Sequence, residues 1–324
     1  MTEWVLRRLF QSILVVLVMT AIVFFGVSVI GDPVETMISP DANQAERDAA
    51  IQALGLDLPL WQQYLRFMSG AIQGDFGQSF VYNQPAFEVI LQRMPATLEL
   101  AVTAVLLSLL IGLPLGLYAG LKPESPISKG LMAGSILGFS LPTFWVGLLL
   151  VLIFAVNLGW LPSGGRGETA RLFGLEWSFL TLDGLRHLIL PAANLALFNV
   201  SLIMRLVRAG VAEVLPQEFI KFARAKGLTE RRVIGVYVLR NIMIPVVTIV
   251  GLELGTVVAF AVVTESIFAW PGMGKLIIDS INLLDRPVIV AYLAVIVIFF
   301  VIVNFIVDFT YTLLDPRIGL QNRK

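Results

Sequence analysis

Six long apolar stretches constrain this chain more than any other feature. They cover residues 9–30, 96–121, 131–161, 188–204, 242–264 and 287–314. A helix of about 20 apolar residues crosses a hydrocarbon core of about 30 Å. Because 57% of the 324 residues are hydrophobic and only 14% are charged, a water-soluble fold of this size could not bury its apolar surface. The sequence therefore predicts an all-α integral membrane protein with six transmembrane helices.

Prolines mark irregularities in two of these stretches. Pro142 lies inside residues 131–161, the longest stretch without a charge. Proline lacks a backbone donor and its ring clashes with the preceding turn, so we expect the helix to kink or break there. Pro191 lies in the short stretch 188–204, and we expect it near the first turn of that helix.

The distribution of basic residues predicts the orientation. Six crossings place both termini on one side of the membrane. If that side is the cytosol, the inner segments hold 15 Lys and Arg residues and the outer segments hold 8. Basic residues are enriched in cytoplasmic segments. We therefore expect a multi-pass membrane protein whose N- and C-termini are cytosolic.

This topology divides the chain into four parts. They are the N-terminus with the first span (1–30), a periplasmic loop (31–95), a five-span core with a cytoplasmic loop at 205–241 (96–314), and a cytoplasmic tail (315–324). The periplasmic loop carries eight acidic and three basic residues. Helical periodicity around residues 45–54 and 60–72 predicts that this loop folds into short helices.

Composition excludes several classes of function. The formal net charge is zero, so no overall basic field favours nucleic acid. The chain has no cysteine and one histidine, His187, which leaves no basis for a thiolate or histidine metal site or a catalytic triad. No Gly-x4-Gly-Lys-Ser/Thr phosphate loop occurs. We therefore expect no catalytic residue, metal site or cofactor in this chain, and a membrane enzyme is disfavoured.

The cytoplasmic loop at 205–241 carries eight basic and three acidic residues. Its residues 217–226 predict a helix that Gly227 ends, and a second helical run begins at Thr229. One stripe of the first helix carries Phe219, Phe222 and Ala223, and Lys221 and Arg224 lie elsewhere. Most basic loops only set topology, but paired helices around a glycine favour a docking surface.

Polar residues within the spans are a second set of candidates. Charges in a bilayer are costly, so Glu99, Glu253 and Asp308 either line a translocation path or contact neighbouring helices. For Glu99 and Asp308, which lie near the span ends, we favour a contact with a neighbouring helix. For Glu253, a contact with a helix and a place in the translocation path are equally favoured. Together with Asn194 and Asn199 in the fourth span, Glu253 is our candidate for the translocation path.

Three further patterns predict packing or exposure. Gly112, Gly116 and Gly120 repeat every four residues and predict close helix packing, more readily within one chain than between subunits. Glu265 is expected to be solvent-exposed at the outer end of the fifth span, and His187 to be a polar interface residue. The tryptophans expected to anchor at the membrane interface are Trp4, Trp145, Trp160 and Trp270.

The cytoplasmic loop also resembles a known family. The stretch Glu218-Phe-Ile-Lys-Phe-Ala-Arg-Ala-Lys-Gly227-Leu, followed by Leu239-Arg240-Asn241 and Pro245, is similar to the signature loop of ABC-importer permeases. It most resembles the dipeptide/oligopeptide/nickel branch, in the permease with the long first periplasmic loop. One departure is Lys221-Phe222-Ala223, where the general signature begins Glu-Ala-Ala.

The resemblance covers nearly the whole chain, because further family strings follow in the same order. They include Gly31-Asp32-Pro33, Leu54-Gly55-Leu56-Asp57, Gly74-Asp75-Phe76-Gly77, Arg93-Met94-Pro95-Ala96-Thr97, Leu141-Pro142-Thr143-Phe144-Trp145, Thr264-Glu265-Ser266-Ile267-Phe268, Trp270-Pro271-Gly272-Met273-Gly274 and Leu314-Asp315-Pro316-Arg317. Each string alone is weak, but their order and spacing together are specific.

The resemblance implies a type I ABC-importer permease fold and a subunit of an ATP-driven importer in a bacterial inner membrane. The implied partners are a second homologous permease, two ABC ATPase subunits that carry ATP and magnesium, a periplasmic substrate-binding protein, membrane lipid and a di- or oligopeptide or peptide-like solute. The implied coupling helix, which fits a cleft of one ATPase, comprises Glu218, Lys221, Phe222, Ala223, Arg224, Lys226 and Gly227.

One alternative of a different class stays open. A proton-coupled secondary transporter could use Glu99, Glu253 and Asp308 as a relay, although the chain shows no inverted repeat of the kind such transporters contain. Vanadate would block uptake by the ATP-driven importer and a protonophore would block the alternative. The sequence leaves the substrate open among dipeptides, longer peptides, glutathione, nickel chelates and sugars.

Overall fold

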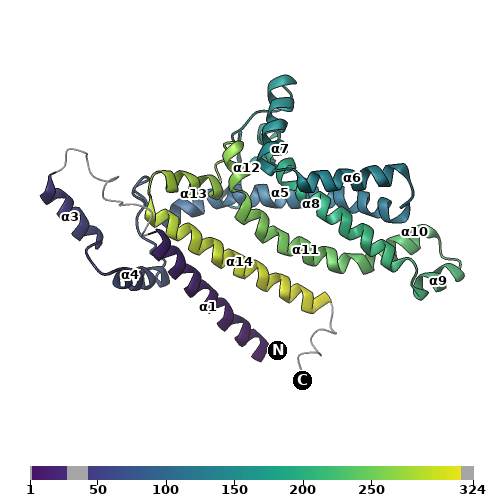
Figure 1. Ribbon diagram of the computed structural model, residues 1–324, viewed down its shortest axis with the longest axis horizontal. Coiled ribbons are helices and arrows are strands. Elements are labelled where there is room, and N and C mark those ends of the chain that lie inside the picture. The colour runs from purple at the N-terminus through teal and green to yellow at the C-terminus, as the bar shows by residue number, and fades with distance from the viewer. Residues whose placement is uncertain (1, 28–42, 315–324) are drawn as a thin grey trace. The chain divides into compact units, whose positions relative to one another are not determined.

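The computed structural model describes residues 2–27 and 43–314. The chain divides into two compact units, one of residues 1–97 and 271–302 and the other of residues 98–270 and 303–324. Figure 1 labels the elements in chain order. Among the described residues, five helices are long and apolar enough to cross a membrane, and a bent pair makes a sixth if it counts as one span.

The first unit consists of helices and the turns that join them. Its helices are α1 (Thr2–Val27), α3 (Gln44–Leu54), α4 (Leu60–Ile72), α13 (Met273–Asn282) and the first parts of α5 (Ala86–Leu121) and α14 (Arg286–Leu314). Helices α3 and α4 confirm the two helices expected in the loop. Asn43 and Glu46 form a reciprocal capping box that starts α3. Helix α4 packs on α1, where the hydroxyl of Tyr64 donates to the Leu17 carbonyl at 3.1 Å.

Buried polar contacts hold the remaining segments of the first unit together. The carboxylate of Asp285 is fully buried and accepts hydrogen bonds from the Ser79 hydroxyl and the Phe80 amide. The hydroxyl of Thr97 accepts from the Met273 amide at 2.7 Å. These bonds tie the entry of α5 to the start of α13 and to the turn before α14.

The second unit holds the remaining elements. They are α6 (Pro126–Ser140), α7 (Thr143–Leu150), the π-helix η1 (Val151–Asn157), β1 (Ala170–Leu172), β2 (Leu175–Trp177), the 3-10 helix η2 (Ser178–Leu180), α8 (Leu182–Val214), α9 (Glu218–Ala225), α10 (Glu230–Arg232), the π-helix η3 (Val233–Val238), α11 (Leu239–Phe260) and α12 (Val262–Ile267). The unit also takes in the later parts of α5 and α14.

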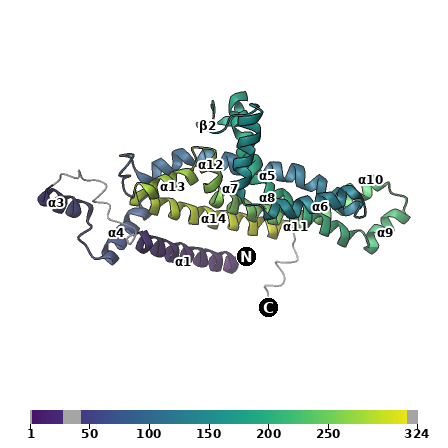
Figure 2. The same cartoon turned by 45° about the horizontal axis from the view of Figure 1, so that its top comes forward.

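A short β-hairpin is the one departure from an all-helical chain among the described residues. Strands β1 and β2 pair antiparallel, with Ala170 opposite Trp177 and Leu172 opposite Leu175; β2 is labelled in Figure 2. Phe173 and Gly174 form the turn with positive φ angles of 54° and 80°, which suits the right-handed twist of a two-residue hairpin. Strands of three residues are too short to give a periodic signal in the sequence.

Helix α8 is the centre of the second unit and packs against α5, α6 and α11. The α5 contact depends on the glycine repeat. A Cβ atom at Gly116 would lie 2.8 Å from the Cβ of Val207, and one at Gly120 would lie 2.6 Å from the Cβ of Val211. Only glycine allows this approach. The prediction that these glycines pack within one chain is confirmed.

The third expected span is broken at Pro142. Helix α6 and the α7–η1 helix meet at an angle of 106°, and α7 leaves the direction of α6 in Figure 1. Leu141 is extended, with a ψ of 134°, because the residue before a proline avoids helical conformation. The predicted break is therefore confirmed.

The fourth and fifth spans differ from their expected bounds. Helix α8 begins at Leu182, because the Thr181 hydroxyl accepts from the Gly184 amide at 2.9 Å and caps it. Pro191 lies inside α8, so its predicted place near the first turn was wrong. Helix α11 ends at Phe260, before the expected residue 264, and α12 follows as a separate helix. A hydropathy pattern identifies only the apolar part of a helix, so it does not predict where the polar ends of the helix lie.

Candidate functional site

The helix predicted in the cytoplasmic loop is present as α9. Gln217 precedes it in extended conformation, and Lys226 follows its last residue. Gly227 then adopts a φ of +76°, in the left-handed region that favours glycine. Thr229 precedes α10, which continues through η3 into α11. Both predicted helix starts and the glycine stop are confirmed.

The buried face of α9 differs from the predicted stripe. Ile220 and Ala223 are buried and belong to a core with Val233 and Val238 of η3. Phe219 and Phe222, expected on the same stripe as Ala223, are 37% and 60% exposed. Ile220 and Ala223 are three residues apart and share one face, so the aromatic rings lie on the neighbouring, outward face.

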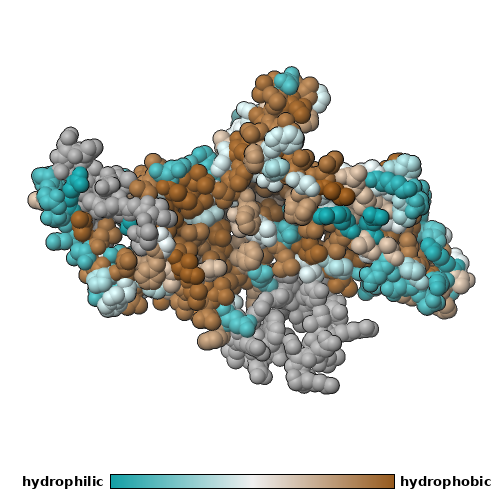
Figure 3. Space-filling model, in the orientation of Figure 1, coloured by the Kyte–Doolittle hydropathy of each residue, from teal (hydrophilic) through white to brown (hydrophobic). Residues whose placement is uncertain are grey.

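Charged and aromatic side chains cover the exposed part of α9. The Lys226 ammonium lies 4.5 Å from the centroid of the Phe222 ring, which is a cation–π arrangement. Lys221 pairs with Glu218 at 2.8 Å, and Arg224 pairs with Glu230 of α10 at 2.8 Å. Figure 3 shows hydrophilic surface gathered over α9 and α10.

The seven residues expected in the coupling helix therefore fall into two groups. Ala223 is buried and packs α9 onto the helices behind it. The exposed residues are Glu218, Lys221, Phe222, Arg224, Lys226 and Gly227. Together with Phe219, they form what we call the α9 surface, an outward surface of two aromatic rings among charges.

The three residues expected in the translocation path lie on α8 and α11. Asn194 is buried and donates to the Thr264 hydroxyl at 2.9 Å. Its carbonyl oxygen and that of Asn199, which is also buried, have no hydrogen-bond partner. Glu253 is half-buried and forms no ion pair with any residue that the structure describes. The membrane part of this unit thus contains polar oxygens without donors.

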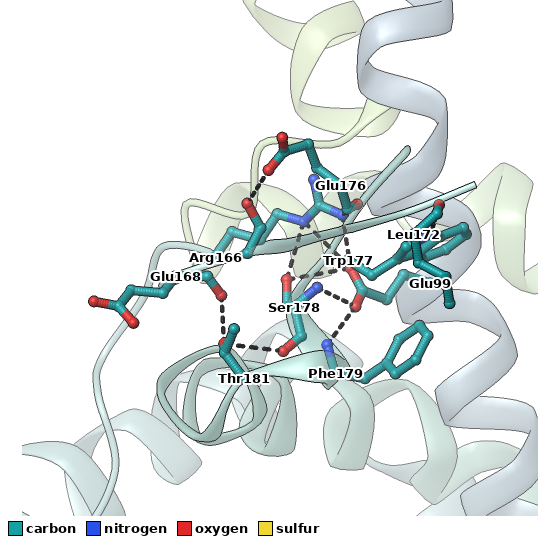
Figure 4. A network of polar contacts seen from close by, with 10 residues as sticks. Glu99, Arg166, Glu168, Leu172, Glu176, Trp177, Ser178, Phe179 and Thr181 are labelled. Atoms are coloured by element: carbon teal, nitrogen blue, oxygen red, sulfur yellow. Dashed lines mark hydrogen bonds and ion pairs between the residues drawn. The ribbon is translucent and has the colours of Figure 1, made fainter. Parts of the chain in front are cut away.

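Glu99 is the centre of a buried polar network (Figure 4). Its Oε2 accepts from Nη2 of Arg166 at 2.7 Å, and its Oε1 accepts from the backbone amides of Ser178 and Phe179 at 2.7 and 2.8 Å. Arg166 also donates to the Glu176 carbonyl at 2.7 Å. The network fixes the hairpin segment to α5, so Glu99 makes a structural contact, but with a loop arginine and the start of η2 rather than with the neighbouring membrane helix that was expected.

Sequence reasoning missed Arg166 as the partner of Glu99. Arg166 is the first charged residue after the charge-free third stretch, and that position could have marked it. Its guanidinium also lies 5.9 Å from the ring centroid of Trp270. The side chains of Trp4 and Asp308 lie outside those that the structure describes.

Two exposure predictions were wrong. Glu265 and Trp270 are fully buried, although Glu265 was expected in solvent and Trp270 at the membrane interface. The chain turns back at the end of α12, where the Trp270 amide donates to the Glu265 carbonyl at 2.8 Å. The loop before β1 then covers this turn, since the Gly165 amide donates to the Phe268 carbonyl at 2.8 Å.

The interfacial roles expected of Trp145, Trp160 and His187 stay predictions. Trp145 and Trp160 are exposed, as anchors at an interface would be. His187 lies with its Nδ1 2.9 Å from the Asp183 carbonyl oxygen, a local contact within α8. No group of three or more His, Cys, Asp or Glu side chains in the described part of the chain is placed to hold a metal ion.

Comparison with protein families decides the class of this chain. Residues 112–320 match the model of the binding-protein-dependent transport system inner membrane component, and residues 1–101 match its N-terminal companion. The chain belongs to this family. As a binding-protein-dependent transport component, it is a membrane-spanning permease.

Several named relatives match this chain over nearly its whole length. The oligopeptide transport system permease protein AppB of Bacillus subtilis (strain 168) is 39% identical over 98% of this chain and 99% of its own. The dipeptide transport system permease protein DppB of Escherichia coli (strain K12) is 37% identical with the same coverage. The glutathione transport system permease protein GsiC of Escherichia coli (strain K12) is 34% identical, again with that coverage.

A solved structure supports the fold. A chain of the MetNI methionine ABC transporter, crystallised in inward-facing conformations, superposes with a TM-score of 0.53 and 16% sequence identity. The match covers 70% of this chain and 96% of that one. The transport component therefore has the type I ABC-importer permease fold that its cytoplasmic loop predicted.

Proposed function

We propose that this chain is the permease subunit of an ATP-driven importer that moves di- or oligopeptides, or a peptide-like solute, into the cell. ATP hydrolysis belongs to two separate ABC ATPase subunits that bind ATP and magnesium. A second homologous permease completes the translocation path, and a periplasmic binding protein delivers the solute. The names of the full-length relatives support a peptide-like solute.

The observation that carries this proposal is the two-sided construction of α9. Its inner face, Ile220 and Ala223, is buried in the core that α8, η3 and α11 share. Its outer face presents Phe219 and Phe222. Exposed aromatic residues among charges are typical of a protein-binding site. A partner that grips the α9 surface would therefore move α8 and α11 with it.

This geometry suggests how ATP could drive transport. We place α9 and both termini in the cytosol, on the side that the basic residues favour. Closure of the two ATPases would draw the coupling helices of the two permeases together. Because interiors are close-packed and transmit displacement, the helices would tilt and expose the solute path alternately to each side. Asn194, Asn199 and Glu253 would line that path, and the apolar outer faces would contact lipid.

One observation counts against the proton-coupled alternative. A relay through Glu99 needs a carboxylate that can exchange protons, but Glu99 is fully buried and holds Arg166 and two backbone amides. These contacts occupy both oxygens of its carboxylate. An importer driven by ATP needs no relay at this position.

The test is purification of the tagged chain from its native membranes in mild detergent, followed by mass spectrometry of the proteins that accompany it. The proposal expects a second permease and P-loop ATPases, and their loss when residues 221–227 are scrambled while the chain itself remains. Uptake into vesicles should stop with vanadate and continue with a protonophore. A chain that purifies alone and transports on a proton gradient would refute the proposal.

A further inference from the structure

Asn199 of α8 and Glu253 of α11 are two polar residues on helices that pack against each other. The two helices touch at one end where a Cβ atom on Gly210 would lie 2.9 Å from Cγ2 of Ile242. Toward the other end of α8, Asn194 donates to Thr264 of α12 at 2.9 Å. Since Asn194 precedes Gly210 and Thr264 follows Ile242, α8 and α11 run antiparallel. Figure 1 shows the two helices side by side.

Helix geometry then gives the positions of Asn199 and Glu253 along the axes of α8 and α11. Asn199 precedes Gly210 by 11 residues, and Glu253 follows Ile242 by 11 residues. Eleven residues make just over three turns and rise about 16 Å. Counted along each helix from the contact of Gly210 with Ile242, both polar residues therefore lie about three turns away, on the same side of their helix as the contact residue.

Apolar residues lie between that contact and the two polar residues. Ile203 of α8 and Val246 of α11 belong to one buried core, and Val250 packs against it. Asn199 is one turn beyond Ile203, and Glu253 is one turn beyond Val250. Each helix thus carries a polar residue one turn beyond this apolar contact.

Both residues present oxygens that lack a donor. The Asn199 carbonyl oxygen is buried with no hydrogen-bond partner, and Glu253 has no ion pair among the described residues. A buried acceptor without a donor, and a carboxylate without a cation, are both costly in a membrane interior. The nearest base on α8, Arg205, is occupied elsewhere, with its guanidinium 4.5 Å from the Phe139 ring centroid.

We infer that Asn199 and Glu253 bind the α-ammonium group of the transported peptide-like solute. An ammonium has three donors and a positive charge, so it would satisfy the Asn199 oxygen and neutralise the Glu253 carboxylate together. Charge-assisted hydrogen bonds of this kind are about twice as strong as neutral ones. The inference rests on the proposed function and adds the chemical group that the path recognises.

The experiment uses the complete importer reconstituted in proteoliposomes together with its binding protein. The reaction also contains ATP and an equimolar mixture of free dipeptides. Mass spectrometry measures the dipeptides taken up. We expect Glu253→Gln to lower uptake about tenfold, since it removes a charged hydrogen bond, and Asn199→Leu to lower it several-fold. Glu253→Asp, which keeps the charge, should retain at least about a third of wild-type uptake.

Two further readouts separate binding from folding and coupling. ATP hydrolysis stimulated by the binding protein should stay within about twofold of wild type in Glu253→Gln. Glu213→Gln, the same change at an exposed position of α8, should leave uptake unchanged. Unaltered uptake by Glu253→Gln, equal loss in Glu253→Asp, or parallel loss of stimulated ATP hydrolysis would each overturn the inference. A wild-type complex without ATP-dependent dipeptide uptake would instead refute the proposed function.

Discussion

Arg166 and Glu99 form a buried ion pair, with Nη2 of Arg166 2.7 Å from Oε2 of Glu99 and side-chain exposures of 13% and 0%. The two residues are 67 positions apart in the chain. Glu99 also accepts two backbone amides at the start of η2. The pair therefore joins α5 to the segment that contains the hairpin.

Breaking this pair should destabilise the protein. Arg166→Met leaves the Glu99 carboxylate buried without its cation, which costs about 3–5 kcal/mol. We expect the unfolding temperature of the purified protein to fall by roughly 5–15 °C. Fluorescence-detected thermal unfolding in detergent measures this temperature.

The matched control is Arg171→Met, because Arg171 is 74% exposed and lies 4.0 Å from Glu176. Such surface pairs contribute about 0–1 kcal/mol, so this variant should unfold close to wild type. The double variant Glu99→Gln with Arg166→Met should lose less than the sum of the two single changes. Equal stability of Arg166→Met and Arg171→Met would contradict the structural role.

The glycine face of α5 should tolerate no side chain. In Gly116→Val, the new Cβ would lie 2.7 Å from the Met204 carbonyl oxygen and 2.8 Å from the Val207 Cβ. We expect α5 and α8 to separate and the yield of folded protein to fall sharply, since overpacking costs about 1–3 kcal/mol or more. Size-exclusion chromatography of the tagged protein measures the folded fraction.

Gly130→Val on α6 is the comparison, because a Cβ there would meet nothing within 4 Å. That variant should keep its folded fraction, since in a helix valine costs no more than glycine. A similar loss in both variants would contradict the role of close packing with α8 in the requirement for glycine.

The exposed ring of Phe222 should carry affinity for the ATPase. Phe222→Ala removes an aromatic side chain that is 60% exposed in the isolated chain, so folding should be unaffected. Aromatic residues dominate protein interfaces, with typical losses of about 2 kcal/mol or more on truncation. We expect at least about tenfold less ATPase to co-purify, as quantified by mass spectrometry.

Phe173→Ala controls for the loss of an exposed phenylalanine. Phe173 lies in the hairpin turn and is 94% exposed, and we place it on the opposite side of the membrane from α9. ATPase recovery with this variant should equal wild type. Unchanged recovery with Phe222→Ala would mean that the α9 surface does not hold the ATPase through this ring.

The left-handed conformation of Gly227 gives a prediction about backbone strain. Its φ is +76° and a Cβ would meet nothing within 4 Å, so only backbone conformation opposes a side chain. Gly227→Val should cost about 1–2 kcal/mol, whereas Gly227→Asn should cost less because asparagine tolerates this region. We expect ATP hydrolysis stimulated by the binding protein to fall in the order wild type, Gly227→Asn, Gly227→Val. Equal activity of the three proteins would show that the end of α9 does not transmit coupling.

Local features of this chain were predictable because their causes are local. The break at Pro142 follows from the geometry of one proline and the residue before it. The limits of α9 follow from Gly227 and from Thr229, which opens the next helix. The apolar stretches predicted which segments form the long helices, but they did not predict that Pro191 lies well inside its helix. Because Thr181 caps α8, the helix begins in polar sequence before the apolar stretch, and a hydropathy pattern does not predict that start.

Contacts between residues far apart in the chain could not be predicted from the sequence, because no local pattern of residues determines them. Glu265 and Trp270 were assigned to solvent and to the membrane interface, but the fold buries both of them in a turn that also bonds to the loop at Gly165. The buried face of α9 also differed, since the core behind it selects Ile220 rather than the rings of Phe219 and Phe222.

The sequence by itself determined that the chain crosses a membrane, which family its cytoplasmic loop resembles and where α9 starts and stops. Composition and short-range backbone preferences suffice for these properties. Only the tertiary structure decided that Arg166 neutralises Glu99 and that the Asn199 carbonyl oxygen is buried without a hydrogen-bond donor. The pairing of two residues depends on how helices pack in space, and a side chain's partner in the membrane interior is set by that packing rather than by its neighbours in the chain.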